Sequence, residues 1–332
     1  MTRHILNYGI LILVVAALVI AGSVYYMHEK NYPSTDDAYI QANVIDVAPQ
    51  VDGRILSVSV KDQEYVKKNQ LLFTIDPTPF NFALQKATAD LTTAKQQVMA
   101  SENAVQAARA LLEQRKAELV NAKKNYTRIM ALVQQAFYAQ SAGDNATQAL
   151  AVAKQAVVAA RDNLAEAEAT RGQSGDQNAQ ILAAKAALSQ AMLNLQYTKV
   201  TAPSSGQIAS LTLRPGQTVT AYQPLFSLVS DKKWWAMANM KETDLSRIRV
   251  NQSAIVHVDM YPQHVFTGVV TSVSPGSGAS FTLLPPENAT GNWVKVTQRF
   301  PVRVDIIHPD ATFPLRIGAS CTVSIDTLSK SS

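Results

Sequence analysis

The residues that could carry chemistry in this 332-residue chain are few, and their spacing does not assemble a site. Of the five histidines, His257 and His264 are seven residues apart in sequence typical of strands. A zinc site needs ligands that share a surface, such as the i, i+4 spacing of a helix, or supporting cysteines. The single cysteine, Cys321, lies in an alternating strand pattern, where a thiol packs as a small apolar side chain. We therefore predict no metal, no cofactor and no internal disulfide.

Catalytic and phosphate-binding motifs are also absent from the sequence. It contains no G-x-S-x-G, no P-loop and no G-x-G-x-x-G after an expected strand. The adjacent Asp36 and Asp37 lie on an extended segment, where neighbouring side chains point apart. The net charge of +5 is spread thinly, without a basic stripe that could neutralise a phosphate backbone. We therefore expect a protein that is not an enzyme and does not bind nucleic acid.

The start of the chain predicts a membrane anchor. Residues Ile5–Met27 contain no Asp, Glu, Lys or Arg, and as a helix they would span about 35 Å, enough for a bilayer core of about 30 Å. Arg3 precedes this run and acidic residues soon follow it, which favours a cytoplasmic N-terminus and an exported remainder. A cleaved signal peptide is the alternative, because Val19–Ala21 resembles a small-residue cleavage site.

A gapless internal repeat brackets the middle of the chain. Gly53–Ile75 aligns with Gly206–Leu228, and apolar residues alternate in both copies as they do in strands. One copy is a small sheet that cannot bury its apolar face alone, so we expect the copies to face each other in one domain. The predicted core positions are Ile55, Val66, Leu72, Phe73, Ile208, Val219, Leu225 and Phe226.

Two facing β-hairpins of this kind look like a biotinyl or lipoyl carrier domain. Such carriers present a lysine at the tight turn between the halves. Here residues 76–200 replace that turn, and the only nearby lysine, Lys199, lies where a helix is expected to return to a strand. We therefore expect a lipoyl-like fold without a modified lysine.

The insertion between the copies has no proline from residue 80 to residue 202 and carries a heptad pattern. Every seventh residue from Leu84 to Val133 is apolar or aromatic, and the residues three positions later are mostly small. The pattern breaks at Ser141–Asp144, and after Arg171–Asp176 it resumes with its phase shifted by three residues. We predict an antiparallel coiled-coil hairpin over residues 80–197, with its tip at about residues 138–145. An Ala-rich bundle folded back on itself is the alternative.

Short alternating runs replace the heptads from Trp234 onward and indicate a small β-barrel or sandwich. The predicted strands are Trp234–Met240, Ser253–Met260, Val265–Val273, Trp293–Gln298, Val302–Ile307 and Ala319–Ile325. The fold class is thus mixed α and β and elongated. It comprises an N-terminal transmembrane helix (1–30), a split lipoyl-like domain (31–79 with the barrel edge, and 198–230), the hairpin (80–197) and a C-terminal β-barrel (231–328).

This order of elements resembles the HlyD-type membrane fusion proteins, the periplasmic adaptors of Gram-negative tripartite pumps. The resemblance rests on Thr35–Tyr39, on VKKNQLLFTIDPTPF (Val66–Phe80) and on TKVTAPSSGQI (Thr198–Ile208). Two further segments are most similar to the EmrA branch, which works with major-facilitator drug:proton antiporters. They are SGASFTLLPPENATGNWVKVTQRFPVRV (Ser277–Val304) and PLRIGASCTVSI (Pro314–Ile325).

The resemblance implies an inner-membrane, single-pass adaptor whose bulk lies in the periplasm. It would link a major-facilitator transporter to a TolC-type outer-membrane channel and assemble as a trimer or hexamer. The family motif places channel contacts at Arg128, Leu132 and Ser141, with a looser last spacing than the family shows; all three also fit as ordinary helix-end residues. Any contact with the drug would lie in the barrel region, at Ser280, Phe281, Asn288 and Trp293.

Two other functions fit the same elements. An adaptor of an ABC exporter for proteins or peptides would share the whole architecture. A periplasmic coiled-coil regulator would need the hairpin but not the split repeat.

Overall fold

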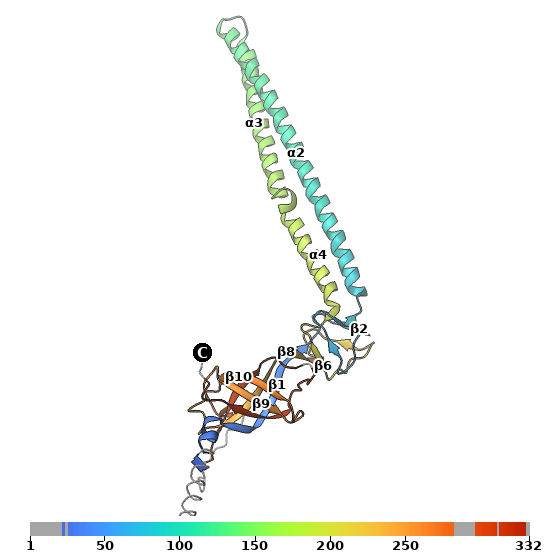
Figure 1. The fold of residues 1–332 in the computed structure, drawn as a ribbon. Helices are drawn as coiled ribbons and strands as arrows, with labels where there is room; N and C mark the ends of the chain where they lie inside the picture. The colour runs from blue at the N-terminus through green and yellow to red at the C-terminus, as the bar shows by residue number, and fades with distance from the viewer. Residues whose placement is uncertain (1–21, 24–25, 282–295, 311, 330–332) are drawn as a thin grey trace, which may run out of the picture.

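The computed structural model describes residues 22–23, 26–281, 296–310 and 312–329. A long helical hairpin, a small β-domain and a β-barrel follow one another along an elongated molecule (Figure 1). The predicted mixed fold with a helical hairpin and a barrel is confirmed. Within the described part of the chain, no helix is both long and apolar enough to cross a bilayer. Most of the predicted anchor lies outside that part, at residues 1–21 and 24–25.

Six antiparallel strands close the barrel. In spatial order they are β1 (Ser34–Val47), β12 (Ser320–Ile325), β9 (Ser253–Val258), β10 (Val265–Val273), β11 (Arg299–Ile306) and β8 (Phe226–Lys241). β8 pairs again with β1, so the ring has no free edge. Cys321 is fully buried in the barrel core, as predicted, and burial raises the pKa of its thiol to about 12. The thiol therefore stays protonated and unreactive.

The strand predicted just before β11 differs from the structure. Residues 296–298 of the predicted strand Trp293–Gln298 are not in a strand, and residues 293–295 lie outside the described residues. Instead β11 begins at Arg299 and includes Pro301. Pro301 has no N–H to donate, and its carbonyl accepts a hydrogen bond from the Ser274 N–H at 2.9 Å.

Strands β1 and β8 extend beyond the barrel into the small β-domain. Ala38–Ala42 pairs with Trp234–Ala238 within the barrel, and Val44–Val47 pairs with Phe226–Val229 beyond it. Between these blocks, Asn43 of β1 faces residues 230–233 of β8, which bulge out of the ladder. The two domains are therefore joined by a hydrogen-bonded ribbon.

Both copies of the sequence repeat build the small β-domain, which we call the split domain. The first half contributes β2 (Gly53–Val58), β3 (Tyr65–Val66) and β4 (Leu71–Ile75), and the second half contributes β5 (Lys199–Thr201), β6 (Gly206–Ala209) and β7 (Thr218–Val219). Gly53 faces Val219 and Gly206 faces Val66, which is the same pairing with the copies exchanged. The split domain thus has internal pseudo-twofold symmetry.

The symmetry extends to turn conformations. Gln63 and Asn69 have positive φ angles of 62° and 67°, and their repeat counterparts Gly216 and Tyr222 have φ angles of 90° and 63°. The Asn69 N–H donates to the Ala202 carbonyl at 2.8 Å, and the Tyr222 N–H donates at 2.8 Å to the carbonyl of its counterpart, Pro49. Each copy therefore anchors a turn on the other copy.

The hairpin consists of one unbroken helix and a return arm in two pieces. α2 (Thr78–Gln134) runs for 57 residues, or about 85 Å. α3 (Gln140–Arg171) and α4 (Ala179–Tyr197) return along it. Apart from Gly143, every buried residue of the two arms occupies a predicted heptad position. These residues are Ala87, Val98, Val105, Leu112, Ala146, Ala160, Ile181 and Ala191. Because α2 is unbroken, the alternative of an Ala-rich bundle folded back on itself is wrong.

The tip lies earlier than the sequence predicts. Residues 135–139 connect α2 to α3, whereas the break at Ser141–Asp144 pointed to residues 138–145. That segment is the first turn of α3, and Gly143 lies where α3 approaches α2 closely. A Cβ atom at Gly143 would lie 3.3 Å from the Met130 Sδ. The glycine therefore serves close packing and not chain reversal.

The second predicted defect is a real interruption between α3 and α4. Gly172 ends α3 with φ 68° and ψ −140°, a conformation open to glycine, and a 3-10 turn, η1 (Gly175–Gln177), follows. The Asn178 side chain then caps α4 by accepting from the Gln180 N–H at 2.9 Å. Its amide also donates to the Arg171 and Gln173 carbonyls at 2.8 and 2.9 Å. The interruption is thus a defined turn that several hydrogen bonds hold in place.

Candidate functional site

Both ends of the hairpin leave the split domain at one place. Thr74, near the end of β4, pairs with Lys199 at the start of β5, and the Ile75 N–H donates to the Thr198 carbonyl at 2.8 Å. The Asp76 carboxylate accepts from the Thr78 N–H at 3.0 Å, and hydrogen bonds from Thr78 lower the pKa of Asp76. Lys199 lies in a paired strand and not at an exposed turn of the kind that carrier domains use.

The eight predicted core residues of the split domain come together beneath the hairpin. All except Leu225 are buried in one cluster, and Leu225 is partly buried against it. Phe73 and its repeat counterpart Phe226 meet edge to face, with ring centroids 6.3 Å apart. The core that joins the two copies is thus also the base of the hairpin.

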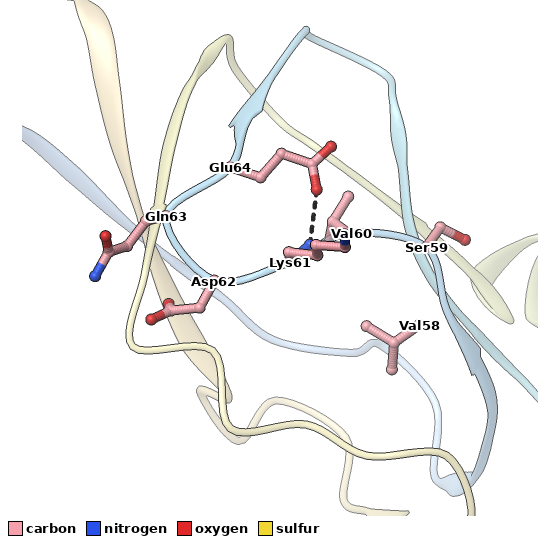
Figure 2. A pocket seen from close by; sticks show the side chains of 7 residues that line it. All are labelled: Val58, Ser59, Val60, Lys61, Asp62, Gln63 and Glu64. Carbon is pink, nitrogen blue, oxygen red and sulfur yellow. Dashed lines mark hydrogen bonds between the residues drawn. The ribbon is translucent and has the colours of Figure 1, made fainter.

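A shallow recess lies beside the loop Val58–Glu64, which supplies all of its lining (Figure 2). The Glu64 carboxylate accepts from the Lys61 N–H at 2.7 Å, and the Asp62 carboxylate accepts from the Leu211 N–H at 2.9 Å. These acidic groups hold the loop to itself and to the second copy and do not converge on a ligand. Among the described residues, no three His, Cys, Asp or Glu side chains are grouped to hold a metal.

A polar cluster at the β8 bulge was missed by the sequence analysis. The Asp231 carboxylate accepts from the Tyr65 and Ser205 hydroxyls, each at 2.6 Å. Partial burial raises the pKa of Asp231, but the hydrogen bonds from Ser205 and Tyr65 outweigh it and leave the pKa below its usual value. The bond to Asp231 raises the pKa of Tyr65. The cluster ties the split domain to the ribbon that enters the barrel.

The predicted drug-contact residues are only partly described. The Ser280 hydroxyl shares a 2.9 Å hydrogen bond with Ser277, in and beside a 3-10 turn, η2 (Gly278–Phe281), that also contains Phe281. Asn288 and Trp293 lie outside the described residues. The drug contact at this loop therefore stays a prediction.

The three predicted channel-contact residues lie near the tip but are not joined to one another by any hydrogen bond in the described part of the chain. Arg128 is exposed and donates to the Asn125 side-chain oxygen at 3.0 Å. Leu132 is half-buried, and its carbonyl accepts from the Phe137 N–H at 2.9 Å. Ser141 is exposed in the first turn of α3.

The tip turn itself presents aromatic side chains. The Ala136 N–H donates to the Val133 carbonyl at 3.0 Å and the Phe137 N–H to Leu132, which is the Schellman pattern of helix ends. Ala136 has φ 61°, where glycine is usual, at a cost of about 1–2 kcal/mol. Phe137 and Tyr138 are 75% and 54% exposed. Sequence reasoning missed both rings because they lie in the turn, outside any periodic pattern.

Comparisons with known families define the class of protein. The family described as "RND MFP, barrel-sandwich hybrid domain" matches residues 43–231, and the "AAEA-like beta-barrel domain" matches residues 233–326. The chain belongs to the membrane fusion proteins, the adaptors of efflux systems.

Its relatives narrow the assignment to an EmrA-like multidrug efflux adaptor. The multidrug export protein EmrA of Haemophilus influenzae is 32% identical over 96% of this chain and 82% of its own length. The multidrug resistance protein MdtN of Shigella flexneri is 33% identical over 95% of each chain. The fatty acid resistance protein FarA of Neisseria gonorrhoeae is 36% identical over 88% of this chain and 75% of its own.

A solved chimeric structure shares the fold. A MacA–MexA chimera that contains the Pseudomonas aeruginosa MexA α-hairpin domain has a TM-score of 0.51 and 21% identity over 89% of this chain and 80% of that one. The periplasmic adaptor protein EmrA has a TM-score of 0.44 and 21% identity over 89% of this chain and 98% of that one.

Proposed function

We propose that this chain is the periplasmic adaptor of a tripartite multidrug pump, linking an inner-membrane major-facilitator drug:proton antiporter to a TolC-type outer-membrane channel. The observation that carries the proposal is the hairpin, whose tip lies at the end of the molecule farthest from the barrel (Figure 1). The turn between α2 and α3 at that tip carries the exposed rings of Phe137 and Tyr138. The names of the relatives support the role in multidrug export.

The proposed mechanism is mechanical, and the protein is not an enzyme. The charge-free run within residues 5–27 anchors the chain as a single-pass protein with its N-terminus in the cytoplasm. The Arg247 guanidinium donates to the Lys30 carbonyl and the Thr327 hydroxyl to the Asn31 carbonyl, each at 2.8 Å. These bonds hold the chain that leaves the anchor against the barrel. The barrel and split domain then pack against other copies in a trimer or hexamer.

Co-purification tests the choice of transporter. The full chain, tagged at its C-terminus and extracted in mild detergent, is expected to recover a major-facilitator antiporter. Recovery of an ABC subunit in its place would support the exporter of proteins or peptides and overturn this part of the proposal.

Hairpin length separates an adaptor from a periplasmic regulator. Deleting one heptad from each arm, residues 112–118 and 158–164, keeps the seam in phase and leaves the tip intact but shortens the hairpin by about 10 Å. An adaptor that must span a fixed distance loses drug export, measured as drug resistance, while circular dichroism shows a folded chain. Unchanged resistance would contradict the adaptor and favour a regulator that needs only its tip.

A further inference from the structure

The barrel is tied to the chain just beyond the proposed anchor. Residues 26–31 are helical, and the apolar run that we propose as the anchor ends at Met27. Asn31 lies four residues later, or about 6 Å along a helix axis. The Asn31 carbonyl accepts from the Thr327 N–H at 3.1 Å and from the Thr327 hydroxyl at 2.8 Å. These bonds hold one end of the barrel directly beside the end of the anchor.

This short distance places that end of the barrel at the level of the lipid headgroups. The headgroup layer of a bilayer is about 5–7 Å thick on each side of the hydrocarbon core. Lys30 lies about 5 Å beyond Met27 along a helix, and a tilt of the helix brings it closer to the core. The Arg247 guanidinium of the barrel donates to the Lys30 carbonyl at 2.8 Å. An anchored chain therefore holds Arg247 within the headgroup layer.

A recess opens at this level between the helical segment and the barrel. The blue helical segment leaves the barrel at the end opposite the hairpin (Figure 1). The recess has a volume of about 390 Å³, within the range of about 300–1,000 Å³ that is typical of ligand pockets. Six of its lining side chains are aromatic or charged, and they are Tyr26, Glu29, Lys30, Lys241, Asp244 and Arg247. Since Tyr26 belongs to the apolar run, the recess begins at the edge of the hydrocarbon core.

The recess contains charges of both signs that do not neutralise one another. Its cations are Lys30, Lys241 and Arg247, and its carboxylates are Glu29 and Asp244. Within the described part of the chain, none of these five groups forms an ion pair. Asp244 and Arg247 are half-buried, so the barrel fixes one charge of each sign in the wall. Both signs are therefore available to a ligand that carries an anion and a cation close together.

We propose that the recess binds the headgroup of phosphatidylethanolamine in the leaflet from which the chain emerges. The phosphate accepts charge-assisted hydrogen bonds from the three cations, and the primary ammonium donates to the two carboxylates. Phosphatidylglycerol offers no cation to the carboxylates, and phosphatidylcholine has a quaternary ammonium without an N–H. This inference rests on the anchor of the proposed function and adds a ligand to it. A protein partner is disfavoured, because headgroups already surround a single-pass helix at this depth.

Native mass spectrometry of the full chain tests the ligand. The chain is extracted in mild detergent and mixed with equal amounts of phosphatidylethanolamine, phosphatidylglycerol or phosphatidylcholine. We expect the ethanolamine lipid to be retained on about fivefold more protein than either of the others. Equal retention of the three lipids would overturn the proposal. An alkaline carbonate wash of membranes separates the two proposals: a chain that is washed off contradicts the anchor and the proposed function, whereas an embedded chain with equal retention overturns the lipid site alone.

Two variants test the two halves of the headgroup. E29Q/D244N keeps the cations and is expected to retain phosphatidylglycerol as well as phosphatidylethanolamine. K30Q/K241Q is expected to retain about fivefold less of both lipids. The matched controls D90N/D162N and K67Q/K68Q change exposed residues of the hairpin and the split domain, and they should bind lipid as the unmodified chain does.

Two results with these variants would contradict the site. A preference for phosphatidylethanolamine that survives in E29Q/D244N would overturn the pairing of the ammonium with the carboxylates. If both recess variants keep the lipid preference but no longer co-purify with the transporter, the recess is a protein contact and not a lipid site. Circular dichroism checks that all four variants are folded.

Discussion

The β-domains and the hairpin are stabilised in different ways. In the split domain and the barrel, large side chains such as Phe73, Leu72 and Met240 are fully buried, and they meet partners far away in the sequence. In the hairpin, the buried seam is narrow and consists mainly of alanine and valine, with no position fully closed to water. The β-domains therefore hold the fold together, whereas the hairpin sets reach and tip geometry. Substitutions should unfold the former and only adjust the latter.

Phe73→Ala is expected to have the largest effect on stability. It removes a fully buried ring that packs against Phe226, which should cost about 3–5 kcal/mol in the free energy of unfolding. Denaturant unfolding followed by fluorescence measures the loss. The control is Phe82→Ala in α2, because Phe82 is 65% exposed and its loss should change stability by less than about 0.5 kcal/mol. Equal losses in the two variants would remove the distinction between the regions.

Gly143→Leu should disturb the hairpin but not the β-domains. The Cβ alone would contact the Met130 sulfur, so a leucine must push α3 away from α2 near the tip, at a local cost of about 1–3 kcal/mol. Hydrogen exchange is expected to speed up in residues 128–147 and stay unchanged in the barrel. Asn145→Leu, on the exposed face of the same turn, serves as the control. Faster exchange throughout the β-domains would show that the two regions are coupled.

Tyr65→Phe should have the smallest effect on stability. The pH dependence of that effect tests the hydrogen bond between Tyr65 and Asp231 at the junction of the split domain and the barrel. Because the pKa of Tyr65 is raised, its stabilisation is complete below the unfolded value of about 10 and is lost as pH rises through the folded value. Because the pKa of Asp231 is lowered, its stabilisation is complete above about 3.9 and is lost as pH falls through the folded value. Between these limits both contributions are constant.

The measurement is denaturant unfolding at neutral and at alkaline pH. At neutral pH, Tyr65→Phe is expected to cost less than about 1 kcal/mol, and at alkaline pH it should lose less stability than the unmodified chain. Tyr222→Phe is the control, because Tyr222 is 78% exposed. If Tyr65→Phe loses as much stability at alkaline pH as the unmodified chain does, then groups other than Tyr65 cause the loss.

The parts of the fold that were predictable are those encoded by short-range patterns. The heptads locate the seam from Leu84 to Leu195, because each position is defined by residues seven apart. The gapless repeat pairs Phe73 with Phe226, because identical spacing in two copies predicts equivalent environments. The closure of the barrel by β1 and β8 has no such signal, since their register joins residues about 200 positions apart and includes a bulge.

The candidate site was less predictable because one residue type can have different structural roles. A glycine can reverse the chain or allow close packing, and an aspartate can be solvated or hydrogen-bonded to the protein. Gly143 marked a chain reversal in the sequence, but it serves close packing, and the reversal occurs at Ala136. Likewise, nothing in the local sequence distinguishes Asp231, which accepts two hydrogen bonds at the junction, from a solvated aspartate. Such assignments depend on tertiary contacts that only the folded chain creates.

The pairing of Thr74 with Lys199 has a consequence for how such proteins diversify. Since the hairpin enters and leaves the split domain at adjacent residues, it is a cassette that can be replaced or lengthened by whole heptads while the hydrogen bonds of its base stay the same. The chimera that shares this fold contains the α-hairpin of another adaptor. Evolution can thus change the reach of the hairpin by editing a single uninterrupted stretch of the gene, while the split domain and the barrel stay the same.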